Sequence, residues 1–284
     1  MMKILTLNTH SLQESYYPEK LEWFVQFVLR EQPDIIALQE VNQTAGARRI
    51  RAERLVGMVS VPGAETPVRE DNHALAVASA LRRSGLEYHW AWIGFKIGYD
   101  KYDEGMAILS RQPMAEVESH LLSSCDDYRN WRTRRVLGFR PVYSTDWFYT
   151  VHMGWWQDAE EPFRAQWERM EAAVQEKKKH GAVWLMGDFN GPAEVRGESY
   201  DCVKHAGWYD TYLLAEDHDD GITVEGAIDG WRDKVADKNV SGMRIDQIWC
   251  SEKTKIRTSR VVLSGKRDPV VSDHYGILIE TGEQ

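Results

Sequence analysis

The chain has 284 residues, of which 43% are hydrophobic and 28% charged, a balance typical of a globular protein that can bury a sizeable core. It contains no apolar run of the roughly 20 residues that a membrane helix needs, and its first residues lack the apolar core and cleavage site of a signal peptide. The net charge of −9 disfavours duplex DNA as a partner, because DNA binding usually requires a basic face. The three cysteines show neither a disulfide framework nor zinc-ligand spacing, so we expect a cytoplasmic protein.

Short apolar strands and amphipathic helices alternate along the chain. Strands are predicted at residues 3–7, 34–38, 90–96, 105–110, 135–143, 147–153, 182–186, 245–250, 256–263 and 274–279. Apolar residues at helical spacing predict helices at residues 18–30, 72–84 and 162–180, and the polar segments 42–71 and 215–241 are predicted to be loops. Because no repeat or linker divides the chain, we expect a single α/β domain over residues 1–284, with two packed sheets and outer helices.

Polar residues stand where several of these strands begin or end. Taken alone, each is most often a turn or capping residue. Together they include two histidines and four acids, which turns alone do not require: Asn8, Glu40, His152, Asp188, Asn190, Asp246, Asp273 and His274. Side chains at strand ends can converge on one edge of a sheet, so this set is the candidate functional site.

These residue types suit metal-assisted hydrolysis of a phosphoric ester. Carboxylates such as Glu40 and Asp273 are hard oxygen ligands of the kind that Mg²⁺ or Mn²⁺ prefers. Such an ion polarises a phosphoryl oxygen and offsets negative charge. Hydrolysis also needs an oriented, deprotonated water, and a histidine fixed by a carboxylate is a common base. Zinc is disfavoured, since no histidine or cysteine pair has ligand spacing.

The motifs around these residues form an ordered series along nearly the whole chain. The series consists of Leu7-Asn8-Thr9, Leu38-Gln39-Glu40, Glu104-Gly105-Met106, Val151-His152-Met153, Gly187-Asp188-Phe189-Asn190, Ile245-Asp246-Gln247-Ile248 and Ser272-Asp273-His274. It resembles the endonuclease/exonuclease/phosphatase superfamily, which includes pancreatic-type deoxyribonuclease. The resemblance implies a four-layered α/β sandwich of two mixed sheets flanked by helices.

The resemblance also implies a role for each residue. Glu40 would bind the metal, with Asn8 and Asp273 close to it. Asp188 would orient or deprotonate the attacking water, and Asn190 would hold a phosphate oxygen. The remaining catalytic residues form two expected pairs: His274 supported by Asp246 on the phosphoryl group, and His152 supported by Glu104 as a second acid/base. Whether Asp188 or a histidine is the general base stays open.

The substrate is predicted from other features of the sequence. Arg132 and Arg134, in an arginine-rich run before a strand, are candidates to bind a phosphate, and Trp155 and Trp156 are candidates to pack on a sugar ring. Acidity, these tryptophans and the opening Leu-Thr-Leu-Asn-Thr-His-Ser are similar to the maltose 6′-phosphate phosphatase branch of the superfamily.

The preferred hypothesis is therefore a Mg²⁺-dependent phosphatase, with Mn²⁺ as the alternative ion, acting on a small phosphorylated sugar. We expect no nucleic acid, membrane or obligate protein partner. The first alternative is a phosphodiesterase of the same superfamily, either a DNA nuclease or a sphingomyelinase-like enzyme. The second is an inactive binding protein on the same fold.

Overall fold

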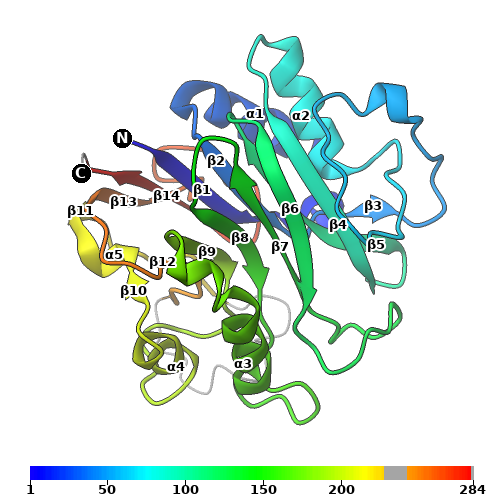
Figure 1. Cartoon of the computed structure of the whole chain (residues 1–284). Helices are drawn as coiled ribbons and strands as arrows, with labels where there is room; N and C mark the ends of the chain where they lie inside the picture. Colours follow the sequence, from blue (N-terminus) through cyan, green and yellow to red (C-terminus); the bar gives the residue numbers. More distant parts are fainter. Residues whose placement is uncertain (227–241, 283–284) are drawn as a thin grey trace.

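The computed structural model describes residues 1–226 and 242–282, and within them two β-sheets lie face to face (Figure 1). The larger sheet has eight strands in the order β11-β13-β14-β1-β2-β5-β3, with β4 paired to the other edge of β5. Its strands are β1 (Lys3–Asn8), β2 (Ile35–Gln39), β3 (Gln43–Thr44), β4 (His89–Gly98), β5 (Tyr102–Ser110), β11 (Ala215–His218), β13 (Ile256–Val262) and β14 (Gly276–Thr281).

The second sheet has six strands in the order β10-β12-β9-β8-β7-β6. Its strands are β6 (Met114–Leu121), β7 (Arg135–Pro141), β8 (Trp147–His152), β9 (Val183–Asp188), β10 (Tyr209–Asp210) and β12 (Asp246–Cys250). Both sheets are mixed: β1 pairs with β2 in parallel and with β14 antiparallel, and β9 pairs with β8 in parallel and with β12 antiparallel.

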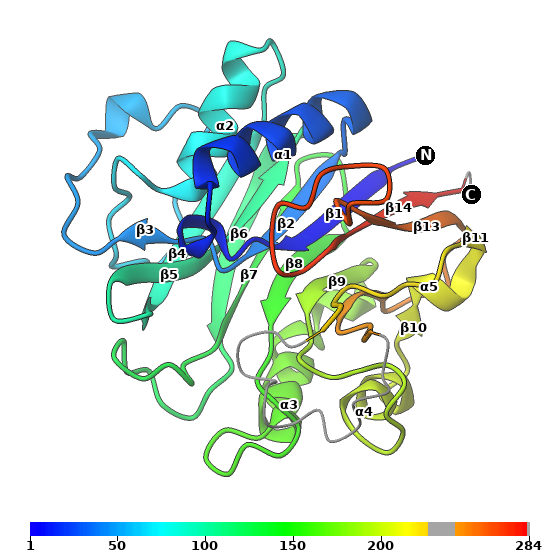
Figure 2. The ribbon, with the colours of Figure 1, turned by 180° about the vertical axis from the view of Figure 1, so that it is seen from behind.

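Helices cover the outer face of each sheet, which gives four layers (Figures 1 and 2). The eight-stranded sheet carries α1 (Tyr17–Glu31) and α2 (His73–Arg83), and the six-stranded sheet carries α3 (Phe163–Val174) and α4 (Ser199–His205). Shorter helical turns are α5 (Thr211–Leu214) and the 3₁₀ turns η1 (Ser11–Gln13), η2 (Ala52–Arg54) and η3 (Lys177–Lys179). This is the four-layered α/β sandwich that the sequence predicted.

The three largest hydrophobic clusters of the described residues hold the layers together, and β1 contributes side chains to two of them. Leu5 and Leu7 pack in the cluster under α1 and α2, whereas Ile4 points into the cluster between the sheets. This alternation follows from the two-residue period of a strand. The third cluster fills the space between the six-stranded sheet and α3 and α4.

A buried polar link joins the two sheets below the candidate site. The side-chain amide of Gln39, at the end of β2, donates to Thr150 Oγ1 on β8 at 2.7 Å and to Thr6 Oγ1 on β1 at 3.2 Å. Gly187 on β9 makes room for this amide, because a Cβ there would lie 2.8 Å from Gln39 Nε2. The strand ends of the two sheets are therefore fixed relative to each other.

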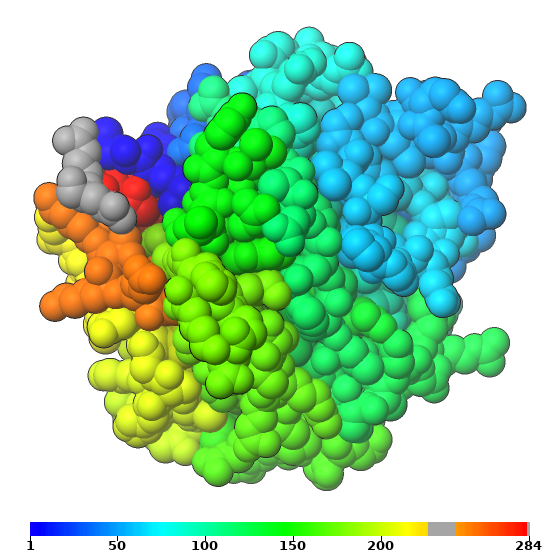
Figure 3. All heavy atoms as spheres, in the orientation of Figure 1, coloured from blue at the N-terminus to red at the C-terminus, as the bar shows by residue number. Residues whose placement is uncertain are grey.

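Several sequence expectations need correction. The helix predicted at residues 162–180 ends at Val174, and η3 follows it. The predicted loop 42–71, which forms one flank of the molecule in Figure 3, contains β3 and η2. The predicted loop 215–241 begins with β11, and its residues 227–241 lie outside the described part. Strand β6 and helix α4 were not predicted.

In the described residues, no helix combines the length and the apolar character needed to cross a membrane.

Candidate active site

Three candidate residues stand side by side in one row across the six-stranded sheet. His152 on β8 pairs in register with Asp188 on β9, and Asp188 pairs with Asp246 on β12. All three side chains are buried. Asn8, at the end of β1 in the other sheet, meets this row through a hydrogen bond from its Nδ2 to Asp188 Oδ2 at 3.2 Å. The site therefore lies where the strand ends of the two sheets meet.

His274 forms the histidine–carboxylate pair expected with Asp246. Its Nδ1 lies 2.9 Å from Asp246 Oδ2, and its Nε2 lies 3.9 Å from Asp188 Oδ2. Burial alone would lower the pKa of His274, but the carboxylates of Asp246 and Asp188 outweigh burial and raise this pKa well above its usual value. His274 is therefore an imidazolium at neutral pH, with Nε2–H directed toward Asp188.

Asp188 is a buried carboxylate with properties suited to accepting a proton. Burial, followed by repulsion from Asp246 and Glu40, raises the pKa of Asp188, although the charge of His274 opposes this shift. Its Oδ1 accepts the backbone N–H of Asn190 at 2.7 Å. A carboxylate whose pKa lies near neutrality can deprotonate a water at physiological pH.

Asn190 follows Asp188 in the left-handed backbone conformation. Its φ of 46° lies in a region that asparagine tolerates better than most non-glycine residues. Its Nδ2 donates to the carbonyl of Met153 at 2.9 Å, just beyond the end of β8. The amide is thus fixed on the wall of the pocket described below, where the sequence expected a phosphate contact.

Glu40 lies across from this row, at the end of β2. Its Oε1 accepts a hydrogen bond from Asn8 Nδ2 at 3.0 Å, whereas its buried Oε2 has no hydrogen-bond partner among residues 1–226 and 242–282. Burial and repulsion from Glu104 raise the pKa of Glu40. Its backbone φ of 50° is also in the left-handed region. A carboxylate oxygen held in this way is suited to a cation.

Glu104 does not support His152, contrary to the sequence expectation. It forms an ion pair with Lys96, its register partner on β4, with Nζ and Oε1 2.8 Å apart. The carboxylate that faces His152 is Asp188, whose Oδ2 lies 3.6 Å from Nε2. Burial, with help from the nearby cations Arg134 and Lys96, lowers the pKa of His152 well below its usual value. His152 is therefore neutral.

Two buried cations lie in the same pocket. Arg134 donates from Nη1 to the carbonyl of Trp131 at 2.7 Å, and Lys96 donates to the same carbonyl at 3.3 Å. Burial lowers the pKa of both groups, and the carboxylates of Glu104 and Glu40 oppose this shift in each case. Burial of these two cations costs desolvation free energy, and an anionic ligand bound beside them would offset that cost.

The pocket has a volume of about 240 Å³ and contains most of the predicted residues. Its lining consists of Glu40, Lys96, Ile97, Gly98, Tyr99, Glu104, Trp131, Arg134, His152, Trp155, Asp188, Asn190 and His274. Acid/base groups, cations and aromatic rings therefore share one cavity.

Two predicted substrate-binding residues lie outside this pocket. Arg132 pairs with Asp158, with Nε and Oδ2 3.1 Å apart, and its guanidinium covers the ring of Trp131. Trp156 packs on Phe163 at the start of α3, with ring centroids 6.2 Å apart. Strand β8 ends at His152, and both indoles lie in the loop that follows.

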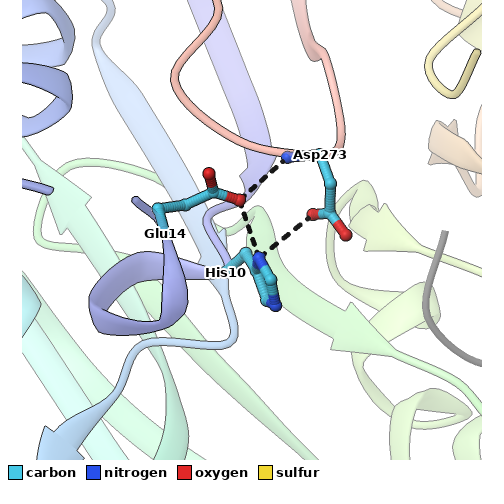
Figure 4. Close-up of side chains that lie close together, drawn as sticks. All are labelled: His10, Glu14 and Asp273. Carbon is cyan, nitrogen blue, oxygen red and sulfur yellow. Dashed lines mark hydrogen bonds and ion pairs between the residues drawn. The ribbon is translucent and has the colours of Figure 1, made fainter. Parts of the chain in front are cut away.

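Asp273 joins a cluster beside the pocket with two residues that sequence reasoning did not select. His10 Nδ1 lies 2.7 Å from Glu14 Oε1 and 3.7 Å from Asp273 Oδ1 (Figure 4). Glu14 Oε1 also accepts the backbone N–H of Asp273 at 3.2 Å. Burial would lower the pKa of His10, but these carboxylates raise it to about 9. One atom from each residue falls within the spacing of a metal site, and Asp188, Asp246 and His274 form a second such group.

Sequence reasoning also missed Lys96, Tyr99 and Trp131. Lys96 offered a signal, because it is a lone cation in an otherwise apolar strand run, Trp-Ala-Trp-Ile-Gly-Phe-Lys-Ile. Tyr99 and Trp131 lie in loops, where no periodic pattern shows which way a side chain points.

A four-layered sandwich with histidine–carboxylate pairs and a buried carboxylate where the strand ends of the two sheets meet is the arrangement that the sequence motifs led us to expect of a phosphoric ester hydrolase. The sequence agrees, since a model of the Endonuclease/Exonuclease/phosphatase family matches residues 5–274. The chain therefore belongs to this family, whose enzymes hydrolyse phosphoric esters and generally depend on a divalent metal. No curated protein matches the chain.

Solved structures share the fold. An endonuclease/exonuclease/phosphatase family protein from Leptotrichia buccalis is 28% identical, with a TM-score of 0.85 and coverage of 100% of both chains. A mannosyl-6-phosphatase from Bacteroides thetaiotaomicron is 18% identical over 100% of both chains, with a TM-score of 0.61. A 3′ phosphatase from Neisseria, bound to a product DNA hairpin, is 21% identical over 100% of both chains, with a TM-score of 0.60.

Proposed function

We propose that the protein is a divalent-metal-dependent phosphatase of a small phosphorylated sugar, with maltose 6′-phosphate as the first candidate. The observation that carries this proposal is the composition of one small pocket. Two buried cations, Lys96 and Arg134, lie in it beside Asp188 and His274, and aromatic rings form part of its wall. The cations suit a phosphate dianion, and the rings suit the apolar face of a sugar.

The residues present fit a divalent metal. Glu40 supplies a buried oxygen without a hydrogen-bond partner among the described residues, and Asp273 is close enough to raise its pKa. We propose that Glu40 and Asp273 hold Mg²⁺ or Mn²⁺, which prefer such oxygen donors. Asn8 orients Glu40, because its Nδ2 donates to Oε1. A bound divalent cation supplies electrostatic stabilisation of the phosphoryl and leaving oxygens.

The proposed reaction replaces the sugar–oxygen bond to phosphorus with a bond from water. Asp188 accepts a proton from the attacking water, as its raised pKa allows. His274, held as an imidazolium by Asp246, donates from Nε2 to a phosphoryl oxygen. Lys96 and Arg134 balance the phosphate charge. The sugar oxygen leaves with the bonding electrons and takes a proton from solvent.

Two relatives support phosphomonoester chemistry without deciding the substrate. Two structural neighbours are phosphatases, one a mannosyl-6-phosphatase and one a 3′ phosphatase bound to a product DNA hairpin. The net charge of −9 and the enclosed cations favour the sugar over DNA.

A substrate panel tests the proposal. The purified protein with Mg²⁺ would be offered maltose 6′-phosphate, glucose 6-phosphate, mannose 6-phosphate, a 3′-phosphorylated DNA hairpin, plasmid DNA and sphingomyelin, and released phosphate and plasmid nicking would be measured. We expect phosphate release from a sugar phosphate at the highest kcat/KM. Plasmid nicking without phosphate release from any sugar would contradict the proposal and favour the phosphodiesterase alternative.

A variant of Glu40 checks that the reaction uses this site. Glu40→Gln keeps the acceptor for Asn8 but removes the charge, so we expect at least a roughly 100-fold loss of kcat. Thermal melting gives an independent readout, because Mg²⁺ should stabilise the wild type and not the variant. Glu87→Gln, in which an exposed surface carboxylate is neutralised, is the matched control.

A further inference from the structure

Tyr99 occupies a backbone conformation that its side chain disfavours. The β4–β5 hairpin turns through Tyr99 and Asp100, with φ values of 51° and 56°, and Lys101 N–H donates to the carbonyl of Gly98 at 3.1 Å. Two consecutive left-handed residues closed by this bond form a type I′ turn. Asn, Asp and Gly fit such a turn, whereas a bulky residue is strained in it. The turn itself therefore does not account for a tyrosine.

The side chain of Tyr99 is fixed from the neighbouring loop. Its hydroxyl lies 2.9 Å from His10 Nε2, and the two rings meet edge to face with centroids 5.6 Å apart. His10 is itself in the left-handed region, with φ 48°, and its other ring nitrogen is bound to Glu14. Two residues with strained backbones, from separate loops, therefore hold each other's side chains in place. Strained residues that are fixed by their surroundings cluster at functional sites.

The hairpin below Tyr99 leaves little freedom of movement. A Cβ at Gly98 would lie 2.4 Å from Glu104 Oε2, so the strand end fits closely against the Lys96–Glu104 ion pair. Tyr99 is therefore positioned relative to the pocket by both its backbone and its hydroxyl.

The ring that is held in this way lines the active-site pocket together with two indoles. Tyr99 and Trp131 remain 39% and 44% exposed, and Trp131 contacts Trp155 with centroids 5.3 Å apart. Lys96 and Arg134 line the same cavity. If the phosphate of a substrate binds Lys96 and Arg134, its ester group lies beside these aromatic side chains.

We propose that Tyr99 is a specificity-determining residue that packs on a sugar ring carrying the phosphate. The inference rests on the proposed phosphatase function and adds the residue that distinguishes its substrate, a phosphate on a pyranose, from a phosphate on an open-chain alcohol. Aromatic faces suit the C–H face of a pyranose, because both are flat and apolar. The strained turn persists because it presents this ring.

Tyr99→Asn separates this role from a structural one. Asparagine fits the type I′ turn, so the variant should fold with an unchanged or higher melting temperature while losing the ring. Tyr99→Phe keeps the ring but loses the contact with His10. Tyr143→Asn is the control, because Tyr143 is 87% exposed in the β7–β8 connection, at the strand ends opposite the site.

Steady-state kinetics would compare maltose 6′-phosphate with glycerol 3-phosphate. For Tyr99→Asn we expect KM for the sugar phosphate to rise about tenfold, which lowers the preference for sugar over glycerol by a similar factor. Tyr99→Phe should show a smaller rise, and Tyr143→Asn none. An unchanged preference in Tyr99→Asn, or an equal loss on both substrates, would overturn the inference.

Calorimetric binding of maltose 6′-phosphate separates this inference from the proposed function. If the wild type binds the sugar phosphate and Tyr99→Asn weakens that binding, but no phosphate is released, the proposed function fails and the sugar subsite stands. If phosphate is released and binding does not depend on Tyr99, the subsite fails alone. If neither binding nor release is observed, both are wrong.

Discussion

Asp246 governs the ionisation of two other residues, so its charge should set the pH dependence of the reaction. It raises the pKa of His274 by attraction and that of Asp188 by repulsion, and burial with the neighbouring charges brings the pKa of Asp188 to about 7. Activity needs Asp188 deprotonated and His274 protonated, which gives a bell-shaped profile with its acid limb near pH 7.

Asp246→Asn should move the basic limb to lower pH. The asparagine oxygen can still accept from His274 Nδ1, but without the carboxylate charge the pKa of His274 falls toward its ordinary value. We expect the basic apparent pKa from kcat/KM to drop by about one unit or more, with loss of activity at pH 8. A uniform loss of kcat with an unshifted profile would show that Asp246 acts only by orienting the ring.

At the level of residues, sequence patterns revealed the groups at strand ends and missed those that loops supply. Asp188 and Asp246 were recognisable because apolar strand residues flank them and motif order supports them. The partner of His152 could not be recognised in the same way, because it depends on strand register. In the register of β4 and β5, Glu104 lies opposite Lys96. Register is a tertiary property, and no local pattern encodes which strands become neighbours.

The contact between helices α1 and α2 contains a histidine that should make stability depend on pH. His73, at the start of α2, is buried against Tyr17 and Phe24 of α1, and its Nδ1 lies 2.9 Å from the Tyr17 hydroxyl. Burial lowers the pKa of His73 to about 4, from the value of 6.5 expected in the unfolded chain. Between these values the unfolded chain binds more protons, so a fall in pH favours unfolding.

His73→Gln removes this proton linkage and keeps a side chain that can accept from Tyr17. The wild type should lose roughly 3 kcal/mol of stability relative to this variant as the pH falls from above 6.5 to about 4, since each pKa unit corresponds to about 1.4 kcal/mol. Urea unfolding at several pH values measures the difference. Parallel stability curves for the two proteins would mean that His73 titrates normally.

At the level of elements, apolar periodicity predicted the buried strands and the first two amphipathic helices to within a few residues, and it extended the third beyond its end at Val174. Helix α2 also begins with a recognisable cap, because Asn72 Oδ1 accepts the Leu75 N–H. Strand β6 was missed for a physical reason. It is an edge strand without a fully buried position and has the polar sequence Met-Ala-Glu-Val-Glu-Ser-His-Leu, so its pairing with β7 rather than its own apolar pattern defines it.

For the molecule as a whole, a strongly acidic chain encloses a pocket that contains buried cations. The net charge is −9, yet Lys96, Arg134 and the His274 imidazolium gather around one cavity, together with the carboxylates of Glu40, Glu104 and Asp188. Distant surface charges are screened beyond about 8 Å at physiological ionic strength, whereas the buried cations are screened much less. Binding of a small anion therefore depends mainly on the buried cations in the pocket. The net negative charge of the whole protein, by contrast, repels an extended polyanion.

This contrast predicts a weak response to salt. Binding of one phosphomonoester releases few counterions, so kcat/KM for a sugar phosphate should change by less than about threefold between 50 and 200 mM salt. Binding to DNA through many phosphates would weaken by roughly 10³- to 10⁵-fold over the same range. Stopped-time phosphate release at several salt concentrations, with the 3′-phosphorylated hairpin assayed in parallel, measures the slopes. A steep slope for the preferred substrate would mean that binding depends on many phosphates of an extended backbone. That result would contradict binding of a single phosphate in the enclosed pocket around Lys96 and Arg134.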